Sequence, residues 1–389
     1  MRAESHCQRL SDELRAGSWR PSEYRVFEIR EPKIRTICAA PFCDRVVHQA
    51  LVQVIEPAFE RGFIADSYSC RIGKGTHAAL SRVERWAHQY PWVLKLDVEK
   101  YFPSVDHKIA LQLVKRRVSC RRTLSMLSLI LASWSSREAP LRWFEGDDLF
   151  DPAVRGRGLP IGNLTSQFLS NIVLDPVDHS VKDRLRIRPY ARYCDDIVVF
   201  SRSVEELHAV HSEMKNALSS LRLVESARKT HIFQTSQGVP WVGFNVYPSV
   251  TVLRQASVRR ARRRFRAFAR RPASDATRAS VAAWRGHAAR GLSVLGVREF
   301  LRMAGVATAV TCASPPDSNH RAHLAACWLW GRRRVGEWNV QSWSSHRTKY
   351  GAADGRIGGG HFERDQFIFE PWLDDPMSGY DCNPPLWQV

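Results

Sequence analysis

Two adjacent aspartates interrupt a β-rich segment near the middle of this 389-residue chain. The stretch PYARYCDDIVVFS, residues 189–201, consists of two short runs of β-forming residues on either side of a Cys-Asp-Asp tip. Two such runs joined by a few turn residues predict a tight β-hairpin, with Asp195 and Asp196 at its tip. Aspartates are also ordinary turn residues, so the pair alone is compatible with simple turn chemistry.

A third aspartate, Asp97, ends another apolar strand, WVLKL, in the segment PWVLKLDVEKYF (91–102). If that strand is the neighbour of the hairpin, the carboxylates converge at one sheet edge, where buried acids need a cation. Hard oxygen ligands suit Mg²⁺, and two such ions about 4 Å apart support in-line phosphoryl transfer. One ion would activate a primer 3′-hydroxyl and the other would hold a triphosphate. The candidate cations for its phosphates are Lys33, Arg35, Lys74 and Lys229.

Predicted helices and strands alternate along the chain to about residue 250. Residues 24–37 predict a hairpin, and apolar residues at helical spacing predict several helices. We expect helices at 43–59, 71–89, 164–183 and 204–221 and after the N-cap Asp106, and strands within VESARKTHIFQ and VPWVGFNVYP. The segment 120–158 has a mixed pattern and is expected to be a loop over a second layer. The order β-α-α-β-β-α-β predicts an α+β fold with a mainly antiparallel sheet.

The excess of basic residues indicates what kind of partner the chain binds. With 58 Lys and Arg residues against 39 Asp and Glu, the formal net charge is +19, which favours a polyanion such as nucleic acid, or an anionic membrane surface. Eight arginines lie between residues 259 and 271, in a predicted basic helix followed by more helix up to about 305. No apolar run approaches the roughly 20 residues of a membrane span. The N-terminus has no apolar signal core, so we expect a cytoplasmic protein without a membrane partner.

Several motifs together resemble those of reverse transcriptases. RYCDDIVVF is similar to their YxDD catalytic hairpin, and LKLDVEKYFPSVDH to their first catalytic motif. PKIRTI, DRVVHQAL, FIADSYSCRIGKGTHAA and SARKTHIF…GVPWVGFNV match the flanking motifs in the expected order. The resemblance implies an RNA-directed DNA polymerase, a nucleotidyltransferase that adds dNTPs to a primer on an RNA template. It implies two Mg²⁺ ions, replaceable by Mn²⁺, held by Asp97, Asp195, Asp196 and the backbone of Val98.

The same resemblance implies the fold and domains of a right-hand polymerase, with a palm built on an antiparallel sheet. The expected boundaries are 1–90 for an N-terminal segment and fingers, 91–115 for the palm with the first catalytic motif, 116–158 for fingers or a connection, 159–250 for the rest of the palm, 251–308 for a helical basic thumb, and 309–389 for a C-terminal extension of unknown role.

Roles for residues around the nucleotide follow from the resemblance. Phe102, five residues after Asp97, matches the steric gate that excludes a ribose 2′-hydroxyl; the alternative is a side chain that only packs in the core. Arg35 matches the fingers arginine that reaches the triphosphate, and Lys33 and Lys74 are weaker candidates for the same site. Lys229 matches a lysine after the hairpin that could protonate pyrophosphate, or it is a solvated lysine.

The loop RGLPIGNLTSQF (157–168) indicates which class of reverse transcriptase the chain resembles. Many reverse transcriptases have glutamine beside the incoming nucleotide where this chain has Ile161, before Gly162. This isoleucine, with Gln167 ending a GxxxSQ pattern, resembles the enzymes of diversity-generating retroelements, which make frequent errors at template adenines. An isoleucine cannot hydrogen-bond and so supplies shape alone. Alternatively, Ile161 is an apolar plug that holds the loop against the fingers. We expect Asn163 and Ser166 to cap the following helix, with Gln167 directed to the template or backbone.

The nucleic-acid contacts and partners are implied in the same way. Tyr193 would lie against the primer end, and Cys194 has no chemical role. Arg259, Arg263 and Arg266 would follow the phosphates of an RNA/cDNA duplex, or form a solvated face. A basic accessory variability protein is an expected partner beside the template RNA. The alternatives are a bacterial reverse transcriptase of another system (retron, phage-defence or group II intron-like) and a non-catalytic nucleic-acid-binding protein.

Overall fold

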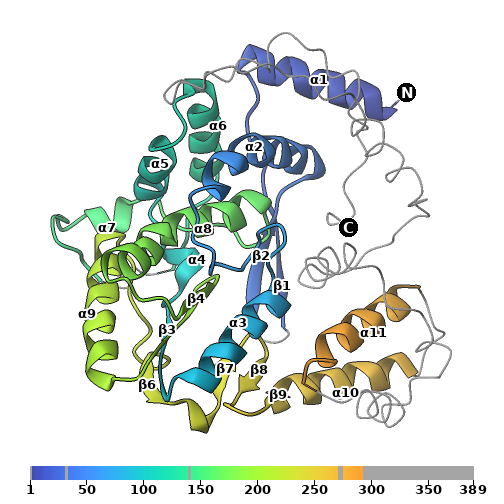
Figure 1. Ribbon diagram of the computed structural model, residues 1–389. Coiled ribbons are helices and arrows are strands. Elements are labelled where there is room, and N and C mark those ends of the chain that lie inside the picture. Colours follow the sequence, from blue (N-terminus) through green and yellow to red (C-terminus); the bar gives the residue numbers. More distant parts are fainter. Residues whose placement is uncertain (1, 31–33, 139–141, 270–274, 292–389) are drawn as a thin grey trace, which may run out of the picture.

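A computed structural model describes residues 2–30, 34–138, 142–269 and 275–291 (Figure 1). Its centre is a four-stranded sheet in the order β4-β5-β3-β6. The strands are β3 (Trp92–Asp97), β4 (Tyr190–Tyr193), β5 (Asp196–Ser201) and β6 (His231–Gln234). Every neighbouring pair is antiparallel, so the predicted α+β class and antiparallel sheet are confirmed.

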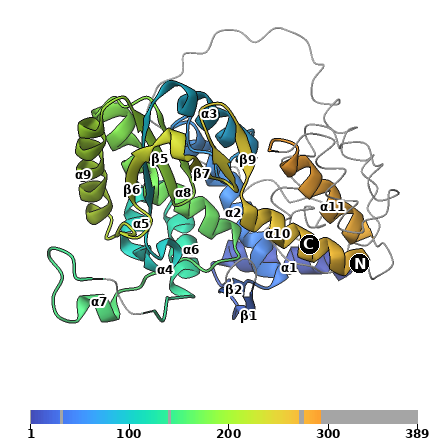
Figure 2. The same cartoon turned by 90° about the horizontal axis from the view of Figure 1, so that it is seen from below.

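One face of this sheet is covered by helices that belong to the larger core. Leu94, Leu96, Ile197 and Val199 point into it, and all four side chains are fully buried. The covering helices are α2 (Phe42–Glu60), α5 (His107–Lys115), α6 (Arg121–Ala132), α8 (Leu164–His179) and α9 (Val204–Ser220). Figures 1 and 2 show α5, α6 and α9 on the side of the sheet away from α10.

The opposite face carries a second core. Val93 and Phe200 from the central sheet pack here with Trp241 and Phe265. The elements that supply this core are α3 (Thr76–Gln89), the antiparallel strands β7 (Val239–Trp241), β8 (Phe244–Val246) and β9 (Thr251–Leu253), and the helices α10 (Gln255–Ala269) and α11 (Asp275–Ala288). Because β3 is buried on both faces, its terminal Asp97 is anchored in a rigid strand.

The remaining elements lie around these layers. They are α1 (Arg2–Ala16), β1 (Arg25–Ile29), β2 (Arg35–Ala39), α4 (Tyr101–Ser104), α7 (Asp151–Val154), the π-helix η1 (Ser180–Arg184) and the 3₁₀ turn η2 (Thr235–Gln237). Strands β1 and β2 form the predicted antiparallel hairpin. No helix in the described part of the chain is long and apolar enough to span a membrane.

Most predicted elements are found, including the Asp106 N-cap, whose carboxylate accepts hydrogen bonds from the backbone N–H groups of Lys108 and Ile109. The prediction for 120–158 is wrong in its first third, where α6 forms a regular helix with Leu127, Ile130 and Leu131 buried. The predicted helix beyond α10 is found as α11, and its extension to 305 lies outside the described residues, as does the C-terminal segment from 309.

Candidate active site

The three predicted acids come together at the end of the central strands. In the β3–β5 register Asp97 lies directly opposite Asp196. Asp195 occupies the turn between β4 and β5, and its carbonyl accepts a hydrogen bond of 3.4 Å from the Val98 N–H. The conditional prediction that strand β3 neighbours the hairpin is thus confirmed.

The electrostatics of these carboxylates reflect their crowding. Burial, reinforced by the negative charges of Asp97 and Asp196, raises the pKa of Asp195 to about 6. Two lysines offset the charge of the other acids: Lys229 Nζ lies 2.5 Å from Asp97 Oδ1, and Lys95 Nζ lies 3.0 Å from Asp196 Oδ1. Two of the three carboxylates are therefore each paired with a lysine.

Lys229 reaches Asp97 because its loop runs beside the end of β3. The Ser226 N–H donates to the Asp97 carbonyl at 2.7 Å, and the Lys229 N–H donates to the Ser226 carbonyl at 2.9 Å. The lysine side chain is 48% exposed, so its ammonium group faces both the carboxylate and solvent. Among the cations predicted for the triphosphate, the structure describes Arg35, Lys74 and Lys229, and of these three Lys229 is paired with a predicted catalytic acid.

Lys95 is a site residue that the sequence reasoning missed. Its side chain is only 11% exposed; besides Asp196 it donates to the Pro240 carbonyl at 2.9 Å, and its ammonium lies 5.7 Å from the centre of the Trp241 ring. The available signal was a lysine within the apolar run WVLKLD, since a buried ammonium needs a counter-ion.

The donor set fits a hard divalent cation. Within the described ranges no three His, Cys, Asp or Glu side chains are arranged closely enough to hold a metal ion. The oxygens of Asp97, Asp195 and Asp196 are nevertheless of the type that Mg²⁺ prefers, and a bound cation would offset the burial and the neighbouring negative charges that raise the pKa of Asp195.

Phe102 and the loop at 157–163 lie together, beside the first catalytic motif. The Leu159 N–H donates to the Phe102 carbonyl, and the Gly158 N–H to that of Val105, both at 2.7 Å. Phe102 is half-buried and packs edge-on against Tyr101 at 5.6 Å between ring centres. The ring is thus partly a core side chain and partly open.

Ile161 and Asn163 connect this loop to strand β2. The Ile161 carbonyl accepts a hydrogen bond of 2.9 Å from the Cys38 N–H, and its side chain is half-buried. Asn163 is the N-cap residue of α8, but its side chain makes no capping bond. Instead Oδ1 accepts from the Ala40 N–H at 3.2 Å and Nδ2 donates to the Cys38 carbonyl at 3.1 Å.

The expected capping role of Asn163 is therefore wrong, because its amide is used to bridge two segments. The expected cap at Ser166 is wrong too, since Ser166 lies inside α8 and is buried. Gln167, the next residue of α8, is half-buried, and its backbone N–H donates to the Asn163 carbonyl. Gly162 has φ +139°, a conformation that favours glycine at this bend.

The other predicted nucleotide contacts are more scattered. Arg35 is an exposed side chain at the first residue of β2. Lys74 Nζ donates to the Ala65 carbonyl at 2.8 Å and lies over the Tyr68 ring, which holds it on its own loop. Lys33 lies outside the described residues. Tyr193 ends β4 half-buried, and burial raises the pKa of its hydroxyl.

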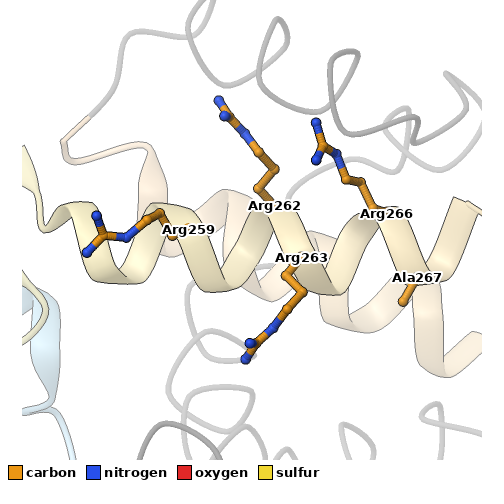
Figure 3. A pocket seen from close by; sticks show the side chains of 5 residues that line it. All are labelled: Arg259, Arg262, Arg263, Arg266 and Ala267. Carbon is orange, nitrogen blue, oxygen red and sulfur yellow. The ribbon is translucent and has the colours of Figure 1, made fainter.

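The predicted arginine helix is α10. Its arginines line a hollow of about 380 Å³ together with Ala267, and Figure 3 shows the side chains reaching out from successive turns. The lining arginines are Arg259, Arg262, Arg263 and Arg266. Phe265, on the other side of the helix, is buried edge-on against Trp284 at 5.3 Å between ring centres.

Comparison with known proteins gives a family match over residues 29–246, more than half of the chain, to the model described as reverse transcriptase (RNA-dependent DNA polymerase). Protein YkfC of Escherichia coli (strain K12) is 26% identical over 276 residues, which cover 61% of this chain and 70% of YkfC. The group II intron-encoded protein LtrA of Lactococcus lactis subsp. cremoris is 21% identical over 59% of this chain and 36% of LtrA.

Two further likenesses cover only part of the matching protein. The putative COX1/OXI3 intron 1 protein of Saccharomyces cerevisiae is 21% identical over 58% of this chain and 25% of its own length. Among solved structures, apo telomerase from Candida tropicalis aligns with a TM-score of 0.44 at 10% identity, over 59% of this chain and 48% of that one.

Proposed function

The chain belongs to the reverse transcriptase (RNA-dependent DNA polymerase) family, and from this we propose that it extends a primer 3′-hydroxyl with dNTPs on an RNA template. The observation that carries the proposal is the placement of Asp97 opposite Asp196 with Asp195 in the adjoining turn. Primer extension by the purified chain on an RNA template tests it. A chain that binds the primer–template but adds no nucleotide would instead be the non-catalytic binding protein.

Asp97, Asp195, Asp196 and the backbone of Val98 would hold two Mg²⁺ ions, or Mn²⁺ in their place. When bound, these ions lower the pKa of the attacking hydroxyl and neutralise the triphosphate. The chain itself contributes position and charge. Lys229, half-exposed beside Asp97, is placed to meet a phosphate or to give a proton to departing pyrophosphate. Lys95 holds the Asp196 carboxylate in one orientation.

We further propose the domain roles of a right-hand polymerase, with palm segments 91–115 and 159–250. The central sheet with α5, α8 and α9 supports the palm assignment. The fingers would include β1 and β2, and the thumb would begin with α10. Arg35 at the start of β2 is the fingers cation proposed for the triphosphate, with Lys33 and Lys74 as weaker candidates for the same role.

Within the family we propose the diversity-generating class, in which the enzyme copies a template RNA with errors at adenines and works with a basic accessory protein. Ile161 supports this proposal, because it stands where many reverse transcriptases have glutamine. Its backbone is bonded to β2 and its side chain is half-buried, which leaves part of the side chain open to a nucleotide. A half-buried side chain can pack as an apolar plug on one side and contact a nucleotide on the other, so the two roles proposed for Ile161 are compatible. Gln167 and Tyr193 would face the template and primer.

Replacing Ile161 with glutamine is expected to lower misincorporation opposite template adenine about tenfold. A glutamine amide restores polar contacts worth on the order of 1–3 kcal/mol of discrimination beside the nascent base pair. Sequencing of cDNA made by both proteins measures the error spectrum. Ile161→Leu, which keeps an apolar side chain, is the matched control, and an adenine error rate that is the same in all three proteins would contradict the role.

A second candidate is a reverse transcriptase of an intron-related system. It is favoured by the similarity to the group II intron-encoded protein LtrA and to the yeast intron 1 protein. The DNA around the gene separates the two candidates. A repeat pair that differs at adenines indicates the diversity-generating class, whereas intron sequence on both sides of the gene indicates the intron-related system.

Replacing Arg259, Arg263 and Arg266 with alanine is expected to weaken binding of an RNA/DNA duplex and make it less salt-dependent. Each lost phosphate contact removes about 0.7–0.9 from the slope of log K against log salt, so the slope becomes shallower by about 2. Fluorescence anisotropy over a salt series measures this. Removing the exposed Arg184, Arg186 and Arg188 changes the net charge equally and serves as control; equal slopes for the two triple variants would rule out a specific role for α10.

A further inference from the structure

Beneath the catalytic hairpin lies an ion pair that the proposed chemistry does not use. The side chains of Arg192, in β4, and Asp178, in α8, are both 0% exposed. Arg192 Nε lies 2.8 Å from Asp178 Oδ1 and Nη2 lies 2.7 Å from Oδ2, so the contact is bidentate. The Tyr190 hydroxyl donates to the same carboxylate at 2.5 Å. The guanidinium is therefore held in a single orientation.

The remaining nitrogen of Arg192 reaches the catalytic turn. Nη1 donates to the Cys194 carbonyl at 3.2 Å and to Asn171 Oδ1 at 3.1 Å. Cys194 has φ +58°, in the left-handed region that residues other than glycine and asparagine rarely adopt. The following residue is Asp195. The guanidinium thus binds the carbonyl of the left-handed residue that directly precedes the predicted catalytic acid.

The backbone of Arg192 is held from the other side. Its N–H donates to the Asp66 carbonyl and its carbonyl accepts from the Tyr68 N–H, both at 3.0 Å. Asn171, which receives Nη1, donates in turn to the Ser69 carbonyl at 2.9 Å. Strand β4, helix α8 and the 66–69 segment therefore meet at this arginine.

A buried ion pair of this kind adds little net stability compared with an apolar pair of similar volume, because both charges lose their hydration. Stability alone is thus a weak physical reason for Arg192 and Asp178. The geometry points to a different role: we propose that Arg192, oriented by Asp178, is a positioning residue that holds the left-handed turn at Cys194 and so directs Asp195 toward Asp97. This inference rests on the proposed polymerase function.

The test compares stability with catalysis in a variant that keeps the space filled. In Arg192→Met/Asp178→Leu both charges are replaced by apolar side chains, so the melting temperature is expected to fall only by the cost of leaving the Tyr190 hydroxyl and Asn171 Oδ1 without these partners. The kcat for single-nucleotide addition should fall about 100-fold, because a misdirected carboxylate costs on that order. The KM for dNTP should change less than about threefold. Arg192→Lys keeps a charge but cannot reach Asp178 and the Cys194 carbonyl together, so its kcat should fall similarly.

Arg155→Met is the matched control. Arg155 is also a buried arginine, with a side chain 8% exposed, but its partners are Asp106, the N-cap residue of α5, and Asp147, and neither belongs to the β4–β5 hairpin. Its replacement should lower the melting temperature and leave the kcat of the folded protein unchanged. A purely structural role for Arg192 predicts that kcat follows stability in all of these variants.

A second readout does not depend on polymerisation. Mn²⁺ binding, followed by electron paramagnetic resonance of the free ion, should weaken about tenfold in the double variant and in Arg192→Lys, and not in Arg155→Met. Wild-type kcat or wild-type Mn²⁺ affinity in a folded double variant overturns the inference, and if that variant does not fold, the same results in Arg192→Lys overturn it. Failure of the wild-type chain to extend any primer on RNA would reject the proposed function, and the Mn²⁺ result would then decide the positioning role alone.

Discussion

Asp97→Asn is expected to reduce primer extension at least about 1,000-fold while the protein stays folded. The substitution keeps the shape of the side chain but removes the charge at the end of β3, directly opposite Asp196. Loss of a metal-ligating or charge-stabilising group at a reacting centre has effects of this size. Single-nucleotide extension on an RNA template measures the rate, and circular dichroism measures the melting temperature. Asp195→Asn should behave in the same way.

Glu84→Gln is the matched control for the acid variants. Glu84 lies on α3 and forms an ion pair of 2.7 Å with Arg290, so the substitution also removes one carboxylate from an ion pair. Its extension rate should equal that of the wild type. Wild-type synthesis by folded Asp97→Asn protein would show that the reaction occurs elsewhere and would remove the basis of the proposed function.

Phe102→Ala is expected to admit ribonucleotides, lowering the preference for dNTPs over rNTPs about 100-fold in kcat/KM. The Phe102 carbonyl accepts a hydrogen bond from the Leu159 N–H, and truncating the Phe102 side chain leaves this backbone hydrogen bond in place. The change therefore removes the half-buried ring and little else. A ring that blocks a 2′-hydroxyl acts by repulsion against the wrong substrate, so its removal affects rNTPs much more than dNTPs.

Phe102→Tyr retains the ring and should retain the exclusion of ribonucleotides. Competition between each dNTP and its ribonucleotide in one extension reaction gives the ratio directly. If Phe102→Ala still excludes ribonucleotides as the wild type does, Phe102 is a core side chain packed on Tyr101, and the steric gate lies elsewhere.

The β4–β5 hairpin was predictable because its signal is local. Two runs of β-forming residues and a polar tip specify β4, β5 and the position of Asp195 without knowledge of the rest of the fold. Strands β3 and β5 are about a hundred residues apart in the sequence, and the pattern of apolar residues does not show that they pair. The resemblance to the reverse transcriptase motifs was needed to predict this pairing.

The parts that sequence reasoning missed depend on long-range partners. Lys95 and Arg192 are charged residues within buried strands, which signals that each has a counter-ion, but Asp196 and Asp178 become visible as their partners only in three dimensions. Asn163 stands at an N-cap position, and local chemistry favours a capping bond there. Instead the Asn163 amide bonds to the Ala40 N–H and the Cys38 carbonyl, because these buried backbone groups would otherwise have no hydrogen-bond partner.

The bridge between the 157–163 loop and β2 has a mechanical consequence. Three hydrogen bonds join Cys38 and Ala40 to Ile161 and Asn163. The end of β2 that contains Cys38 is therefore fixed to the 157–163 loop. A displacement of this end of β2 would therefore move the backbone of Ile161 with it, so that the strand and the loop behave as one mechanical unit.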